Sequence, residues 1–253
     1  MYPAPLLSPH RGMSVWPGAR QEANRITMAD DGPAIPGIVL AGGLARRMGG
    51  GDKGLCLLHG RPLLAHICAR IRPQVTMLAL NANGDPSRLT QVLSREPDYS
   101  AWAPAAILHD QIPDFPGPLA GVLAGLAWAE SHGFTHMLSV PGDTPYLPPD
   151  LVHRLWIARQ SLTETSQEAA GTAIALARSG DRTHPVIGIW PVMLKDALSQ
   201  ALHNGMRRIG QFTAAFPVAH AQWAMTDAGD PFININTPAD LDHARLAGAA
   251  FPS

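Results

Sequence analysis

The sequence predicts an α/β domain, with a mostly parallel central sheet covered by helices on both faces. Short apolar runs alternate with helical stretches, as in parallel strands joined by crossover helices. A glycine-rich basic loop follows the first apolar run directly, and single polar residues follow several later runs. At 253 residues and 46% hydrophobic content, the chain is long enough for one well-packed domain.

Composition excludes several function classes. The formal net charge is −1 and charged residues make up 15%, so there is no global basic field to hold nucleic acid. Cys56 and Cys68 are too few for a disulfide scaffold, and we interpret them as small apolar residues in a reducing cytoplasm, the expected location. No apolar run reaches the roughly 18 residues of a membrane span, so we expect no membrane partner.

The first residues differ from the rest. Residues 1–34 hold several prolines and no helical or alternating pattern, so we expect a disordered extension there. Met28 offers an alternative start. The folded domain is predicted to cover residues 35–250.

Each element is predicted from local signals. Pro62 marks one helix start, Ser87 is a candidate N-cap, and Thr237 followed by Pro238 begins the last helix. The expected strands are 35–40, 75–80, 105–108, 136–140, 172–177, 186–190, 218–222 and 232–235, in a sheet of roughly seven. The expected helices are 63–71, 87–93, 119–131, 151–160, 192–203, 206–214 and one from 238, with a surface loop at 161–171.

The loop after the first strand carries the clearest chemical signal. Residues 38–54 read IVLAGGLARRMGGGDKG. Glycines let backbone N–H groups approach an anion closely, and basic side chains add charge, so we interpret the segment as a polyphosphate-binding loop. The alternative is a glycine-rich surface turn. Because the chain has only two lysines, Lys53 and Lys195, background solubilising charge is a poor explanation for Lys53.

Polar residues also gather where strands are expected to end. Gly42, Gly43, Asn81, Asp110 and Asp143 each follow an apolar run. Ligands of open α/β sheets bind outside the carboxyl ends of the strands, so this coincidence predicts one shared site. Taken singly, each Asp or Asn could instead be a cap or turn residue.

Asp143 is the candidate metal ligand. A carboxylate after a buried strand can hold Mg²⁺ through one oxygen while phosphates and waters complete the octahedron. The alternative role is a cap for the following helix, for which Asp150 is closer.

These motifs resemble the molybdenum cofactor guanylyltransferase (MobA) family. Its pattern LAGG-x-x-x-RMGG-x-DKG is present from Leu40 to Gly54, and PGDTPY and FININTP occur further on. The resemblance covers about residues 36–247 and implies a single-domain, Rossmann-like nucleotidyltransferase fold.

The resemblance implies a reaction and its partners. GMP would pass from Mg-GTP to Mo-molybdopterin, giving the guanine dinucleotide cofactor and pyrophosphate, with Mg²⁺ as cofactor. A molybdenum insertase and molybdoenzyme chaperones would be the protein partners.

The family's site residues carry over by position. Lys53 would meet phosphate, Asp143 would bind magnesium, and Arg47 would contact phosphate or pyrophosphate, whereas Arg46 could equally be solvated. The nucleotide side comprises Leu40, Ala41, Gly42, Gly43, Asn81 and Asp110, with either Asn81 or Asp110 reading the guanine edge. Asn234 and Asn236 would alternate to one face of a strand and bind phosphate or pterin, or else close the sheet edge.

Two rival functions stay open from the sequence. One is a related molybdopterin cytidylyltransferase or a sugar-phosphate nucleotidyltransferase, against which Gly42-Gly43 and PGDTP favour guanine. The other is a non-catalytic GTP-binding module, against which Lys53 and Asp143 argue.

Overall fold

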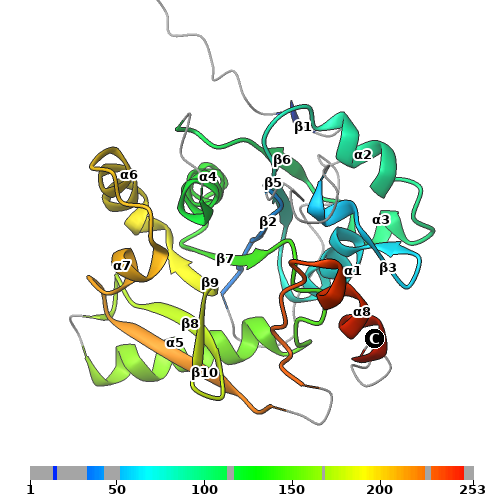
Figure 1. The fold of residues 1–253 in the computed structure, drawn as a ribbon. Helices are drawn as coiled ribbons and strands as arrows, with labels where there is room; N and C mark the ends of the chain where they lie inside the picture. The colour runs from blue at the N-terminus through cyan, green and yellow to red at the C-terminus, as the bar shows by residue number, and fades with distance from the viewer. Residues whose placement is uncertain are drawn as a thin grey trace, which may run out of the picture.

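The main sheet places the first strand of the domain at its centre. The computed structural model describes residues 14–15, 33–42, 52–112, 117–166, 169–225 and 229–247. Within these residues the chain forms an eight-stranded sheet of order β1-β6-β5-β2-β7-β9-β8-β10 and a separate two-stranded hairpin (Figure 1). The predicted mostly parallel α/β architecture is confirmed.

The central strands are short and almost fully buried. They are β2 (Gly37–Leu40), β5 (Leu78–Asn81), β6 (Ala106–Leu108) and β7 (His136–Pro141). β2 is parallel to both β5 and β7, and β5 is parallel to β6. Burial on both faces explains why these strands are continuous apolar runs in the sequence.

The remaining strands complete the two edges. β9 (Arg182–Pro191) is antiparallel to β7 and to β8 (Ile174–Ser179), and β10 (Val218–Trp223) is parallel to β8. At the other edge the two residues of β1 (Ser14–Val15) are antiparallel to β6. Most of the predicted extension 1–34 lies outside the described residues, so its disorder stays a prediction.

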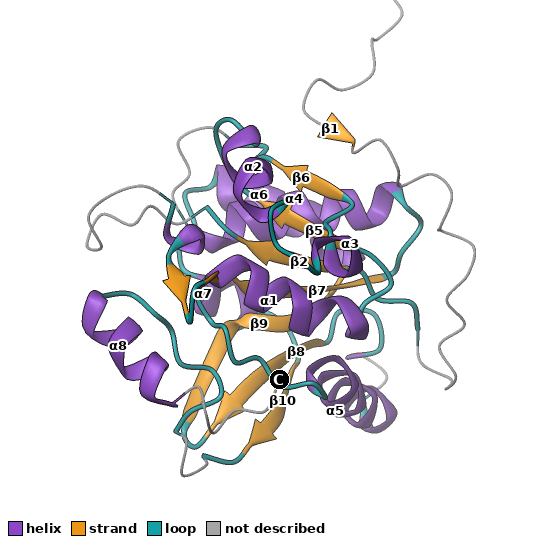
Figure 2. Ribbon diagram, turned by 90° about the vertical axis from the view of Figure 1, so that its right-hand side faces the viewer, coloured by secondary structure: helices purple, strands orange, loops and turns teal. Residues whose placement is uncertain are grey.

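Helices cover both faces of the sheet, as Figures 1 and 2 show. One apolar cluster joins one face to α1 (Leu63–Ile71), α2 (Ser87–Leu93), α3 (Tyr99–Trp102) and α5 (Leu151–Thr165). A second joins the other face to α4 (Pro118–Ser131), α6 (Lys195–His203) and α7 (Ile209–Thr213). No helix among the described residues is long and apolar enough to cross a membrane.

A small third cluster holds the C-terminal helix α8 (Pro238–Ala247) against the hairpin of β3 (Leu57–Leu58) and β4 (Arg61–Pro62). The hydroxyl of Tyr146 donates to the carbonyl of Ala244 at 2.5 Å. Because Tyr146 follows the end of β7, this bond fixes α8 close to the carboxyl end of the sheet.

Some predicted elements differ from the structure. Residues 232–235 form a turn and an irregular segment rather than a strand, because their backbone N–H groups bond to Asp230 and Asp143 instead of a neighbouring strand. α5 continues through the predicted loop to Thr165. Ser87 is the first residue of α2 rather than its cap, and its N–H and hydroxyl both donate to Asp85.

Glycines let α4 lie close to the sheet. A Cβ built on Gly125 would lie 2.5 Å from Sδ of Met137 and 2.9 Å from Cδ1 of Ile38, and both of these side chains are fully buried. Real Cβ atoms do not approach that closely, so the packing of α4 on β2 and β7 depends on this glycine.

We therefore predict that Gly125→Ala lowers the free energy of unfolding by about 1–3 kcal/mol, because the core must shift to admit one methyl group. Gly210→Ala in α7 is the matched control: a Cβ there meets nothing within 4 Å. Alanine favours a helix, so this change should raise stability by about 0.5–1 kcal/mol. Urea unfolding measures both, and equal effects would contradict the packing argument.

Candidate active site

The site lies where the strand order reverses. From β2 the chain moves outward to β5 and β6, then returns to the other side of β2 to form β7. Crevices at such a reversal, outside the carboxyl ends of the strands, are where open α/β sheets bind ligands. Asn81, Asp110 and Asp143 lie at or just after the ends of β5, β6 and β7, as the sequence predicted.

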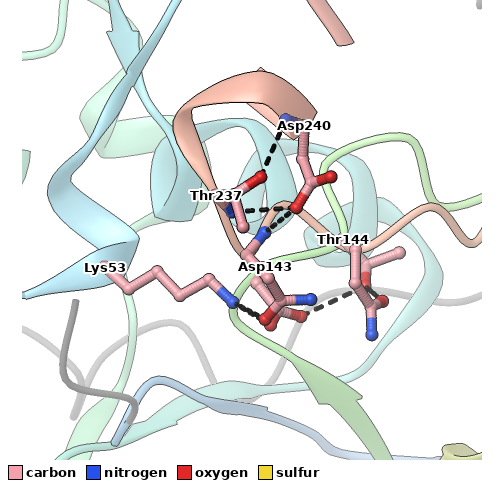
Figure 3. Close-up of polar contacts among 7 residues, drawn as sticks. Lys53, Asp143, Thr144, Thr237 and Asp240 are labelled. Carbon is pink, nitrogen blue, oxygen red and sulfur yellow. Dashed lines mark hydrogen bonds and ion pairs between the residues drawn. The ribbon is translucent and has the colours of Figure 1, made fainter. Parts of the chain in front are cut away.

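An ion pair lies just beyond the carboxyl end of β7 (Figure 3). The ammonium of Lys53 lies 2.5 Å from Oδ2 of Asp143 and donates to Oδ1 of Asn236, also at 2.5 Å. The side chains of Lys53 and Asp143 are 12% and 21% exposed. The ammonium of Lys53 therefore lies between one oxygen of Asp143 and one oxygen of Asn236, two residues that are far from it in the sequence. We call this place the cation position.

The second predicted asparagine supports the same cluster. The hydroxyl of Thr144, which is fully buried, donates to Oδ1 of Asn234 at 2.7 Å. The N–H of Ile235 donates to the carbonyl of Asp143 at 2.9 Å. The two asparagines thus lie beside Asp143 as expected, although the segment that carries them is not a strand.

The start of α8 fixes this segment. Oδ2 of Asp240 accepts from the N–H groups of Asn236 and Thr237, both at 2.8 Å, and the N–H of Asp240 donates to Thr237 Oγ1 at 3.2 Å. This reciprocal capping confirms Thr237 as the N-cap. The backbone hydrogen bond from Asn236 is the main cause that lowers the pKa of Asp240, which keeps its carboxylate charged.

A second polar cluster forms on the β5 and β6 side. Asn81 Nδ2 donates to Oδ1 of Asp110 at 3.0 Å, and Asn83 Nδ2 donates to Oδ2 at 2.6 Å. The N–H of Asp110 donates back to Oδ1 of Asn83 at 3.0 Å. Asn81 is only 4% exposed, and the two amides together give each carboxylate oxygen of Asp110 one hydrogen-bond donor.

Between the two clusters lies the end of β2. The N–H of Gly142 donates to the carbonyl of Leu40, and the N–H of Ala41 donates to that of Asn81. A Cβ on Gly142 would lie 2.8 Å from the Leu40 oxygen, so only glycine allows this approach. Gly42 is exposed, and a Cβ there would meet none of the described residues within 4 Å.

Three predicted loop residues, Gly43, Arg46 and Arg47, lie outside the described residues, and their roles stay predictions. Asp150 precedes α5, but its side chain makes no cap hydrogen bond. Its carboxylate accepts from the indole N–H of Trp223 at 3.1 Å instead.

The chemistry of the Lys53 position suits a hard cation. Its acceptors are one carboxylate and one amide oxygen, and Mg²⁺ is usually held by one or two carboxylates together with substrate phosphates and water. Among the described residues there is no group of three or more His, Cys, Asp or Glu that could hold a metal by themselves. Asp143 therefore fits a metal shared with a phosphate substrate, and does not fit an all-protein metal cage.

Sequence reasoning missed three residues in these clusters, Asn83, Thr144 and Asp240, and it also missed Asp52, whose carboxylate forms an ion pair with Arg88. The spacing of Asn81 and Asn83 was an available signal, since residues two apart in an extended segment share a face. Asp240, three residues after Thr237, was the other available signal, because it resembles a capping box. No local sequence pattern indicates the partners of Asp52 and Thr144, which lie 36 and 90 positions away in the chain.

Comparison with known proteins identifies the family. Residues 37–222 match the family described as the MobA-like NTP transferase domain. The chain belongs to this family. It is 47% identical over 218 residues to a molybdenum cofactor guanylyltransferase of Bradyrhizobium sp. strain ORS 278, covering 85% of this chain and 93% of the relative. It is 48% identical over 223 residues to the enzyme of that name from Rhodopseudomonas palustris strain HaA2, covering 87% and 94%.

A solved structure shares the MobA-like fold. Molybdopterin-guanine dinucleotide biosynthesis protein A from Archaeoglobus fulgidus superposes with a TM-score of 0.62 at 21% identity, covering 85% of this chain and all of that one. The expected nucleotidyltransferase fold and enzyme class are confirmed. The curated relatives also carry the name of the activity that the sequence resemblance implied.

We predict that Lys53→Ala separates catalysis from stability. The pair with Asp143 is partly exposed, so its loss should lower the free energy of unfolding by no more than about 1 kcal/mol. The rate of nucleotidyl transfer should fall by about tenfold or more, because a cation that faces phosphate stabilises the charge that develops in the transition state. Urea unfolding and pyrophosphate release measure the two effects.

Lys195→Ala is the matched control. Lys195 is the other lysine of the chain and makes an equally short ion pair, 2.5 Å from Glu130, between α6 and α4. It should cost similar stability and leave turnover unchanged. If Lys53→Ala and Lys195→Ala have the same turnover, Lys53 has no role in the reaction.

Proposed function

We propose that this enzyme transfers GMP from Mg-GTP to the terminal phosphate of Mo-molybdopterin, releasing pyrophosphate. The single observation that carries the proposal is the pair of polar clusters on either side of β2. One presents a fixed carboxylate suited to a base edge, and the other a cation position suited to phosphate. Neighbouring strands lie roughly 5 Å apart, and the ends of β5 and β6 are two and three strands away from the end of β7, so the two clusters are about 10–15 Å apart, which suits the two ends of a nucleotide.

Asp110 is the residue that we assign to the guanine edge. A carboxylate can accept from the N1–H and N2–H₂ donors of guanine, which adenine and cytosine do not present together. Asn81 is almost fully buried and donates to Asp110, so we assign it to orienting Asp110 rather than to contacting the base. Each oxygen of Asp110 accepts one amide hydrogen bond, which leaves each a lone pair for the base.

Asp143 and Lys53 act on the phosphates. Asp143 would hold the magnesium, which would supply neutralisation of the negative charge at the reacting phosphate. The ammonium of Lys53 occupies the cation position beside Asp143. A change of its side-chain rotamer would let it contact a triphosphate bound there. Direct in-line transfer needs no covalent intermediate, since positioning and charge stabilisation supply the catalysis.

Asn234 and Asn236 are suited to the acceptor. Both use their side-chain oxygens within the protein, towards Thr144 and Lys53. Their NH₂ groups make no such bonds within the described part of the chain, and they can donate to a phosphate or pterin oxygen. We also propose a cytoplasmic location, in keeping with the two free cysteines, Cys56 and Cys68, and a molybdenum insertase and molybdoenzyme chaperones as protein partners.

Asp143→Asn tests the metal assignment. The amide keeps an oxygen but loses the charge that favours a hard dication, so turnover should fall by at least about a hundredfold and the Mg²⁺ requirement should rise. Melting without ligand should change little, since the Lys53 ammonium can still donate to the amide oxygen of the asparagine. Asp196→Asn, on exposed α6, is the control. Near-normal pyrophosphate release at ordinary Mg²⁺ would remove Asp143 from the site.

Nucleotide choice tests the reaction. We expect GTP with Mg²⁺ to raise the melting temperature more than CTP, ATP or UTP, because selective binding stabilises the folded state. Asp110→Asn should reduce the preference for GTP by about tenfold or more, the usual value of a bidentate base contact. Asn83→Ala, which removes one support of Asp110, should reduce it less. Selective stabilisation by CTP would favour the cytidylyltransferase alternative, and GTP binding without pyrophosphate release on adding acceptor would favour the non-catalytic module.

A further inference from the structure

We propose that Arg88 is a positioning residue that ties the base side of the nucleotide site to its phosphate side. The proposal rests on the proposed function, because it assigns a role within that same site. Arg88 lies in the first turn of α2, outside both polar clusters, and the sequence gives it no motif.

The guanidinium of Arg88 joins three backbone or side-chain acceptors. Its Nε donates to the carboxylate of Asp52, with which it forms an ion pair. Its Nη2 donates to the carbonyl of Asn83 at 2.6 Å, and its Nη1 to the carbonyl of Asp85 at 3.3 Å. The Asp52 side chain is only 12% exposed, so this pair is better shielded from water than an ordinary surface pair.

Each of the two distant acceptors is next to a group that we place on the nucleotide. Asp52 directly precedes Lys53, and its carbonyl accepts the N–H of Leu55, which forms the short helix that begins at Lys53. The side chain of Asn83 makes two hydrogen bonds with Asp110: its Nδ2 donates to the carboxylate, and its Oδ1 accepts from the backbone N–H. Arg88 therefore links the residue before the phosphate-facing lysine to the amide that fixes the base-reading carboxylate.

Helix α2 keeps the guanidinium in place. Leu89 and Leu93 are each only 1% exposed within the apolar cluster under the sheet, so the helix that carries Arg88 is anchored to the core. Because α2 is anchored in this way, Arg88 can hold Asp52 and Asn83 at a fixed spacing.

The chemistry of the link requires arginine. The guanidinium presents its N–H donors in a fixed planar fork, whereas an ammonium is a compact point charge. Gly84 has a left-handed backbone conformation, with φ +83°, and a Cβ there would lie 2.6 Å from Arg88 Nη1. Glycine at this position thus serves both the left-handed backbone and the approach of the guanidinium.

The expected effect is on nucleotide binding rather than on folding. With Arg88→Ala, the base-side and phosphate-side groups lose their fixed spacing, and the Kd and KM for GTP should each rise about tenfold, the value of one or two charge-assisted hydrogen bonds. The KM for the acceptor should stay within about twofold, since the link touches neither asparagine of the acceptor side. Arg88→Lys should recover only part of the loss, because a lysine can pair with Asp52 but cannot also hold the Asn83 carbonyl.

The experiment measures GTP binding by calorimetry, steady-state kinetics and melting temperature for Arg88→Ala, Arg88→Lys, Asp52→Asn and the double variant Arg88→Ala/Asp52→Asn. Arg95→Ala, an exposed arginine just after α2, is the matched control and should match the unmodified enzyme. In the double variant the losses should not add, because both changes break the same link. A GTP affinity within twofold of the unmodified enzyme in Arg88→Ala, or full rescue by lysine, overturns the proposal.

A purely structural role gives a different pattern. If Arg88 only stabilised the fold, its variants would lower the melting temperature and reduce active protein, with the Kd of the folded fraction unchanged. If Arg88→Ala does not fold, Arg88→Lys and Asp52→Asn decide the matter by the same criterion. If the unmodified enzyme binds another nucleotide in place of GTP, the proposed substrate is wrong, and the link is then judged by the affinity for the nucleotide that binds.

Discussion

The position of β2 between β5 and β7 is the constraint on which the site depends. Because all three strands are parallel, their carboxyl ends meet at one edge, where the strand order reverses. Open α/β sheets bind their ligands in the crevice outside such a reversal. The bond from Gly142 to the Leu40 carbonyl extends this pairing beyond the last strand residues. The backbone is thereby brought so close that a side chain at Gly142 would not fit. The chemical groups therefore occupy loops whose starting points are fixed by the sheet.

Electrostatics then divides the crevice into two parts. On the β7 side, Asp143 and Asn236 offer oxygens to a cation, and they accept hydrogen bonds from the ammonium of Lys53. On the β5 side, each oxygen of Asp110 accepts one hydrogen bond from an amide. A nucleotide that carries donors on its base and negative charge on its phosphates matches this division. Binding of a polyanion at this site, as we propose, requires only these local charges and no net charge on the whole chain.

The C-terminal segment completes the site from a distance. Asn234 and Asn236 enter it because Asp240 caps the start of α8 and Tyr146 holds the far end of that helix to the sheet. The burial of Ile235 between the two asparagines anchors the loop in the small cluster under α8. The packing of a helix thus sets the positions of two amides beside Asp143. The last helix therefore helps to build the proposed site.

The sequence by itself determined the α/β class, the parallel sheet and most strand-end residues of the site, because these depend on local apolar runs and on glycine and carboxylate positions. Through a resemblance to the family that the match confirms, it also predicted Lys53, Asp143 and the two asparagines as site residues, and their roles stay predictions. It wrongly made residues 232–235 a strand, since alternation of apolar and amide side chains does not reveal that the backbone bonds to Asp143. Only the tertiary structure decided that Asn81 supports Asp110, and that Arg88 reaches Asp52. Those facts depend on which side chains are buried together, and contacts between residues 29 and 36 positions apart leave no periodic trace in the sequence.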